Sequence, residues 1–135
     1  MNSESEKAGP TFFAPHLTVR NVLAELEFCQ AAFGAMELRR WSNPDGTVHV
    51  AELSINGALF HLHEEMPGGS EKCPNSLKGT TSAIGLFVPD PAATVKRAIA
   101  SGARESSPVQ DYDYGYRQGT VIDPAGHVWL IQRKI

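Results

Sequence analysis

The second half of this 135-residue chain repeats the order of elements found in its first half. A β-rich run over residues 12–19 is followed by helical apolar spacing over 22–33. The same succession returns as a β-rich run over 82–88 and helical spacing over 92–100. The tripeptide Gly-Thr-Val also occurs in both halves. Duplication of one strand–helix–strands unit explains these matches more simply than a chance similarity between two such units.

Turn and cap residues divide the chain further. Asn21 and Gly34 are suited to begin and end the first helix, because an Asn side chain accepts backbone hydrogen bonds and Gly adopts the left-handed conformation. Asn56-Gly57 predicts a type I′ hairpin turn. The expected organisation is a disordered terminus over 1–10 and a single domain over 11–135, with module one at 11–65, a Gly/Pro/Ser-rich linker at 66–80 and module two at 81–135.

Composition excludes several classes of protein. The net charge is −3 and the basic residues are scattered, so no nucleic-acid partner is expected. Apolar runs are too short to cross a membrane, and the start lacks the features of a signal peptide, which predicts a cytoplasmic protein without a membrane partner. Of the two cysteines, Cys29 is expected to be buried in a helix and Cys73 to be exposed in a polar loop.

The predicted hairpin determines which side chains share a face, because residues opposed across a two-residue loop point the same way. Glu52 then lies directly across from His61, and alternation along the first strand adds His16 to their side. One face is apolar and suited to lie under a helix; it carries Ala51, Leu53, Ile55, Ala58, Phe60 and Leu62. The other is largely polar; it carries Val48, Val50, Glu52, Ser54, Leu59, His61, His63 and Glu65.

Four motifs are typical of a known family: Leu17-Thr-Val-Arg-Asn, Phe33-Gly34-Ala35, Ala51-Glu-Leu-Ser-Ile-Asn-Gly and Asp123-Pro-Ala-Gly-His-Val-Trp129. Through them, residues 12–133 resemble the vicinal oxygen chelate superfamily of glyoxalases, bleomycin-binding and fosfomycin-inactivating proteins and extradiol dioxygenases, and within it the PhnB-like branch. The resemblance implies an α+β fold in which two tandem βαβββ modules form a cup-shaped, eight-stranded mixed sheet with helices outside. It also implies homodimers whose subunits share the cups.

Many members of that superfamily hold a divalent metal, and the resemblance places the usual ligand positions at Ala14, Glu52, Ala83 and Leu130. Only Glu52 can donate a lone pair. In the PhnB-like branch a His often stands where this chain has Val50. We therefore expect no cofactor and no metal at the usual site. A relocated site is an open alternative; it would use His16, Glu52, His61 and His63.

The functions left open differ in what the polar face does. The first is a metal-free homodimer that binds and sequesters a small, aromatic or antibiotic-like molecule. The second is a lyase, isomerase or related enzyme in which Glu52 and His61 are a catalytic acid/base pair. The third is an interaction domain with a filled cup. The ligand-binding candidates are His16, Val50, His63, Tyr114 and Arg117. Several of these residues also have interpretations without a function. Histidines on this face could simply be solvated, and Arg117 could pair with Asp113 or Asp123. Structural roles are expected for His49, His127 and Trp129.

Overall fold

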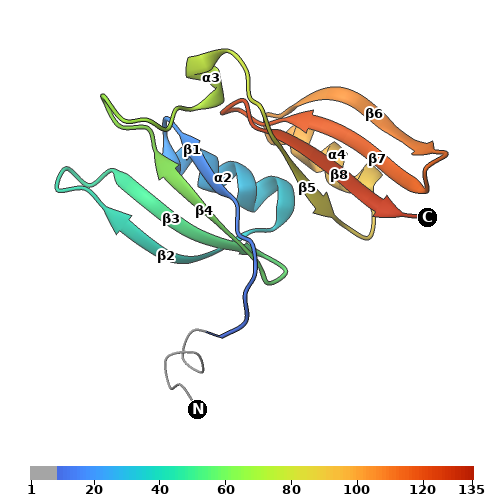
Figure 1. Ribbon diagram of the computed structural model, residues 1–135, viewed down its shortest axis with the longest axis horizontal. Helices are drawn as coiled ribbons and strands as arrows, with labels where there is room; N and C mark the ends of the chain where they lie inside the picture. The colour runs from blue at the N-terminus through green and yellow to red at the C-terminus, as the bar shows by residue number, and fades with distance from the viewer. Residues whose placement is uncertain (1–8) are drawn as a thin grey trace.

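A computed structural model describes residues 9–135 and shows two βαβββ modules joined by a short helical connection (Figure 1). The first module contains β1 (His16–Val19), α2 (Val22–Phe33), β2 (Met36–Ser42), β3 (Val48–Ile55) and β4 (Ala58–Glu64). The connection contains α3 (Pro74–Leu77). The second module contains β5 (Ala83–Phe87), α4 (Pro91–Ala100), β6 (Arg104–Tyr112), β7 (Tyr116–Ile122) and β8 (Val128–Lys134). The disordered terminus expected over 1–10 falls almost entirely outside the described residues.

The repeated unit predicted from the sequence is confirmed by the strand order, which is β1-β4-β3-β2 in one sheet and β5-β8-β7-β6 in the other. The expectation of one continuous eight-stranded sheet is corrected, because within residues 9–135 no strand of one module pairs with a strand of the other. Side chains bridge the modules instead. His127 of the β7–β8 turn places its Nε2 2.8 Å from the carbonyl oxygen of Thr18 in β1.

The cap and turn residues predicted from the sequence occur where the helix and the hairpin begin or end. Asn21 accepts a hydrogen bond from the Ala24 amide at 3.0 Å and begins α2, and Gly34 ends it with φ 68°. At the hairpin turn Asn56 and Gly57 have φ values of 49° and 87°, as a type I′ turn requires. The resulting register pairs Glu52 with His61, as predicted.

The apolar face of each sheet is buried beneath helices, and α2 packs against α4 behind the two sheets (Figure 1). Leu53 and Leu62 are fully buried under α2. Trp129 is buried as predicted, and its ring lies 4.6 Å from that of Phe33 at the end of α2. The two modules therefore share one hydrophobic core. No helix within residues 9–135 combines the length and the apolar character needed to span a membrane.

The connection between the modules is held more firmly than a loose linker would be. The Glu65 carboxylate accepts hydrogen bonds from the Cys73 amide at 2.6 Å and from the Ser76 hydroxyl at 3.1 Å. The expectation that Cys73 is exposed was wrong. Cys73 is 1% exposed, and its thiol lies 3.1 Å from the Ala125 carbonyl oxygen. Cys73 precedes the short helix α3, and its contact with the β7–β8 turn joins segments that are distant in the sequence, which local composition does not reveal.

Candidate functional site

Four side chains form a line across the first sheet, one from each of its strands. The register pairs His16 of β1 with His61 of β4, His61 with Glu52 of β3, and Glu52 with Arg39 of β2. Residues paired in this way share a face of the sheet, and here it is the face opposite α2. We call His16, His61, Glu52 and Arg39 the polar row.

The centre of the polar row is a hydrogen-bonded pair. His61 Nε2 lies 2.9 Å from Glu52 Oε2, and the two side chains are 27% and 29% exposed. A carboxylate accepts this bond from an imidazole N–H, which orients the ring and leaves the other ring nitrogen free to accept a proton. The cross-strand contact predicted from the hairpin is thus present. Its chemistry suits proton transfer or hydrogen bonding to a ligand.

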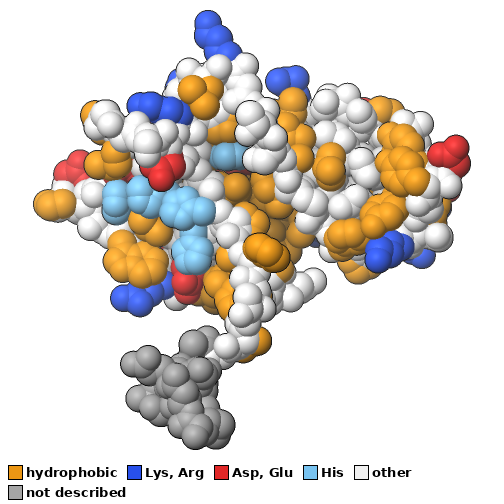
Figure 2. Space-filling model, in the orientation of Figure 1, with side chains coloured by type: hydrophobic (Ala, Val, Ile, Leu, Met, Phe, Trp, Pro, Cys, Tyr) orange, Lys and Arg blue, Asp and Glu red, His pale blue; other side chains and the backbone are white. Residues whose placement is uncertain are grey.

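Two further histidines lie beside the polar row, so that histidine side chains gather on this face of the first module (Figure 2). The His63 ring lies 5.1 Å from that of His16 and 4.7 Å from that of His49. His49 is the second residue of β3, and its Nδ1 lies 3.2 Å from Glu64 Oε1. His63 Nδ1 bonds the Glu64 carbonyl oxygen at 2.9 Å, so both rings have a partner within the fold.

The surroundings of His16 keep its imidazole neutral. Burial lowers the pKa of His16, and the neighbouring His63 and His61 lower it further, while Glu71 acts in the opposite direction. A neutral ring carries one donor and one acceptor. At neutral pH His16 can therefore hydrogen-bond a ligand group of either kind.

Arg39 and Trp41 complete the site, although alternation along the strand did not single them out. The Arg39 guanidinium carbon lies 4.4 Å from the centre of the Trp41 ring, and Trp41 is 37% exposed. Among residues 9–135 no carboxylate pairs with Arg39. Irregular pairing in β2 on either side of these two residues hides their register from simple alternation. The one available signal is the spacing of a cation and an aromatic residue two positions apart in a strand.

Residues 9–135 do not offer a group of ligands that fits a metal ion. In the described part of the chain, no three His, Cys, Asp or Glu side chains converge in an arrangement that could hold one. The relocated set of His16, Glu52, His61 and His63 does not form such a group, and the ring centres of His16 and His61 are 6.4 Å apart. Ala83 and Leu130, at two of the family's ligand positions, offer no lone pairs.

Tyr114 and Arg117 lie on the second module, in and beside the β6–β7 turn, at the far end of the molecule from the first sheet (Figure 1). Arg117 donates to Asp111 at 2.7 and 3.2 Å rather than to Asp113 or Asp123. Tyr114 stacks on Tyr112 with ring centres 5.1 Å apart and remains 59% exposed. Within one chain these two candidates therefore do not join the polar row.

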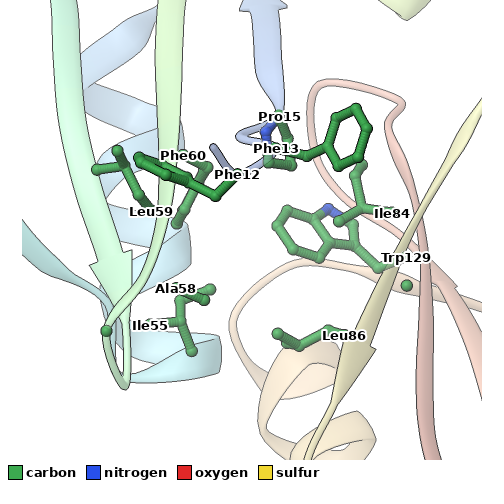
Figure 3. A pocket seen from close by; sticks show the side chains of 12 residues that line it. Phe12, Phe13, Pro15, Ile55, Ala58, Leu59, Phe60, Ile84, Leu86 and Trp129 are labelled. Carbon is green, nitrogen blue, oxygen red and sulfur yellow. The ribbon is translucent and has the colours of Figure 1, made fainter. Parts of the chain in front are cut away.

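A large apolar cavity also lies away from the polar row. It has a volume of about 630 Å³, sits between the two modules and is lined by none of the four polar-row residues (Figure 3). The polar row itself is open on its outer side. A ligand there would need a further surface to enclose it.

Comparison with known proteins agrees with the motifs and the fold. The sequence profile of the Glyoxalase/Bleomycin resistance protein/Dioxygenase superfamily matches residues 11–131. The chain belongs to this superfamily. Among its relatives, the protein Mb0911c of Mycobacterium bovis is 38% identical over 125 residues, which cover 90% of this chain and 82% of that one.

Two solved structures show the same superfamily fold. TioX from Micromonospora sp. ML1 is 25% identical with a TM-score of 0.70, and the match covers 93% of this chain and 97% of TioX. The PhnB protein from Bacillus cereus is 16% identical with a TM-score of 0.68, covering 91% and 99%. The expected superfamily is thereby confirmed, and the PhnB-like branch within it stays a prediction.

Proposed function

We propose that this glyoxalase/bleomycin-resistance protein binds a small molecule over the polar row without the family's usual metal. The observation that carries the proposal is the presence of unused binding groups on one open face. Arg39 has no carboxylate partner among the described residues, and Trp41 exposes an aromatic surface beside it. Small-molecule sites combine such apolar area with a few polar groups that orient the ligand. Val50 and His63 border the row and, together with His16 within it, complete the proposed contacts.

A homodimer would enclose this site. One chain leaves the polar row open, and it also leaves apolar side chains exposed on the second module, including Phe87 at 54% and Tyr114 at 59%. Exposed aromatic surface of this kind is typical of protein interfaces. We propose that the second module of another copy covers the polar row, which would bring that copy's Tyr114 and Arg117 to the ligand.

A second candidate function is enzymatic, and the 2.9 Å contact between His61 and Glu52 favours it. Glu52 would hold the imidazole in one orientation and stabilise its protonated form. His61 would then remove a proton from the ligand and return it elsewhere, as in an isomerase or a lyase. Arg39 would stabilise the negative charge left on the ligand.

Thermal-shift screening of small carboxylates, phenols and heteroaromatic compounds tests the binding proposal, followed by calorimetry on each hit. Arg39→Ala and His61→Ala should each weaken binding by about tenfold or more, as expected when a ligand loses a charged or hydrogen-bonding partner. Arg104→Ala is the matched control, because Arg104 is an exposed arginine at the start of β6 in the other module.

Product analysis of wild-type protein with the same hits separates binding from catalysis. Turnover that is lost in Glu52→Gln while binding persists would establish the enzymatic candidate. Unchanged affinity in both Arg39→Ala and His61→Ala would refute the proposed location of the site.

A further inference from the structure

The cavity between the modules has walls contributed by four separate segments (Figure 3). Ala58 and Phe60 of β4 line one side, and Ile84 of β5 and Trp129 of β8 line the other. Phe12 and Phe13, in the extended segment before β1, lie at its edge. The cavity therefore fills the gap that remains where the two sheets fail to join.

The chemistry of these walls is uniformly apolar. No charged or titratable side chain lines the cavity. The one polar side-chain atom in the walls is Trp129 Nε1, which donates to Asp123 at 2.9 Å within the fold and is not available to a ligand. A volume of about 630 Å³ lies within the range of small-molecule sites. Cavities lined by aliphatic and aromatic side chains take apolar ligands in preference to water.

The segment before β1 leaves much apolar surface without a partner. Phe13 is fully exposed and Phe12 is 63% exposed. A phenylalanine left in water forgoes the free energy that burial of its ring would contribute. A molecule seated in the cavity would cover part of both rings.

We propose that this cavity is a second binding site, which takes an uncharged apolar molecule of aromatic character. It goes beyond the function proposed for the polar row, because it shares no residue with that row and lies between the two modules. Phe12 and Phe13 provide exposed ring faces for stacking, and Ala58 and Ile84 limit the width between the modules.

The test uses N-phenyl-1-naphthylamine, an uncharged probe whose fluorescence rises in apolar surroundings. Wild-type protein should bind one probe per chain in a saturable manner. The chain contains two tryptophans, so Trp41→Phe leaves Trp129 as the only donor for energy transfer to the bound probe. Transfer from Trp129 to the probe should be detectable in that variant.

Two substitutions fill the cavity from opposite walls. Ala58→Phe and Ile84→Phe should each weaken probe binding by about tenfold or more, because the added rings occupy the ligand's space. Ala31→Phe is the matched control, since Ala31 is exposed on α2 and does not line the cavity. Circular dichroism and thermal melts identify any variant that fails to fold. If one cavity-filling variant fails, probe binding is measured with the other.

Three results would overturn the proposal: no saturable binding, equal binding in two folded cavity-filling variants, or no energy transfer from Trp129. Sedimentation measured with and without the probe tests whether a second copy of the chain occupies the cavity instead. If the probe is expelled when the chains associate, a second copy of the chain occupies the cavity and the small-molecule assignment is wrong.

Discussion

Replacement of Glu25 by Gln should make the protein more stable in alkaline solution, because Glu25 is a buried acid that holds its proton in the folded state. Glu25 belongs to α2 and is 3% exposed. Burial, followed by hydrogen bonding to Asp123 and the charge of Asp123, raises the pKa of Glu25 to about 10. The Asp123 side chain accepts hydrogen bonds from the amides of Ala125 and His127 and from the Trp129 indole, at 2.9–3.0 Å.

The size of the effect follows from the two pKa values of Glu25. The unfolded chain releases this proton near the ordinary value of 4.5, whereas the folded chain keeps it until about 10. Between these values the unfolded state binds fewer protons, so the free energy of unfolding falls as pH rises. The fall is about 1.4 kcal/mol per pH unit, or about 3 kcal/mol between pH 6 and pH 8. For a domain of this size that corresponds to about 10 °C in Tm.

Urea denaturation of the wild type and Glu25→Gln across this pH range measures the effect. Gln has no proton to lose and can still donate an amide hydrogen bond to Asp123. Its stability advantage over the wild type should therefore grow with pH. Glu27→Gln is the matched control on the exposed side of the same helix, and its advantage should stay constant. A wild-type pH slope that persists unchanged in Glu25→Gln would refute the reasoning.

Three further results are expected. Trp129→Phe should cost about 2–4 kcal/mol in urea denaturation, because it opens a small void and leaves buried Asp123 without one of its donors; a loss under about 1 kcal/mol would contradict this role. Gly57→Ala should cost about 1–2 kcal/mol, since Gly57 has φ 87°, and an unchanged Tm would show that the turn can rearrange. Treatment with EDTA should leave the Tm unchanged; a fall that added metal reverses would reveal a metal site.

The parts of the site that the sequence predicted are those determined by short-range geometry. A two-residue turn at Asn56-Gly57 allows one register, so alternation alone placed Glu52 opposite His61. The same logic separated the buried face from the open one. The duplicated order of elements predicted both modules, because each unit repeats the same succession of strand, helix and turn signals.

The parts that the sequence did not predict depend on irregular or distant contacts. Arg39 follows a register shift in β2, and alternation cannot be carried through such a shift. Glu25 and Asp123 meet only because α2 of one module packs near the β7–β8 turn of the other. Cys73 is buried for a similar reason. The division into two sheets likewise depends on how the modules pack, which no local pattern describes.

The most direct test of the polar row as a binding site is a nuclear magnetic resonance titration of isotope-labelled protein with a screening hit. The account predicts that the largest shifts fall on the imidazole resonances of His61 and His16 and on the guanidinium of Arg39, with smaller shifts at the backbone of β3 and β4. Shifts confined to other parts of the molecule, with these three side chains unmoved, would contradict it.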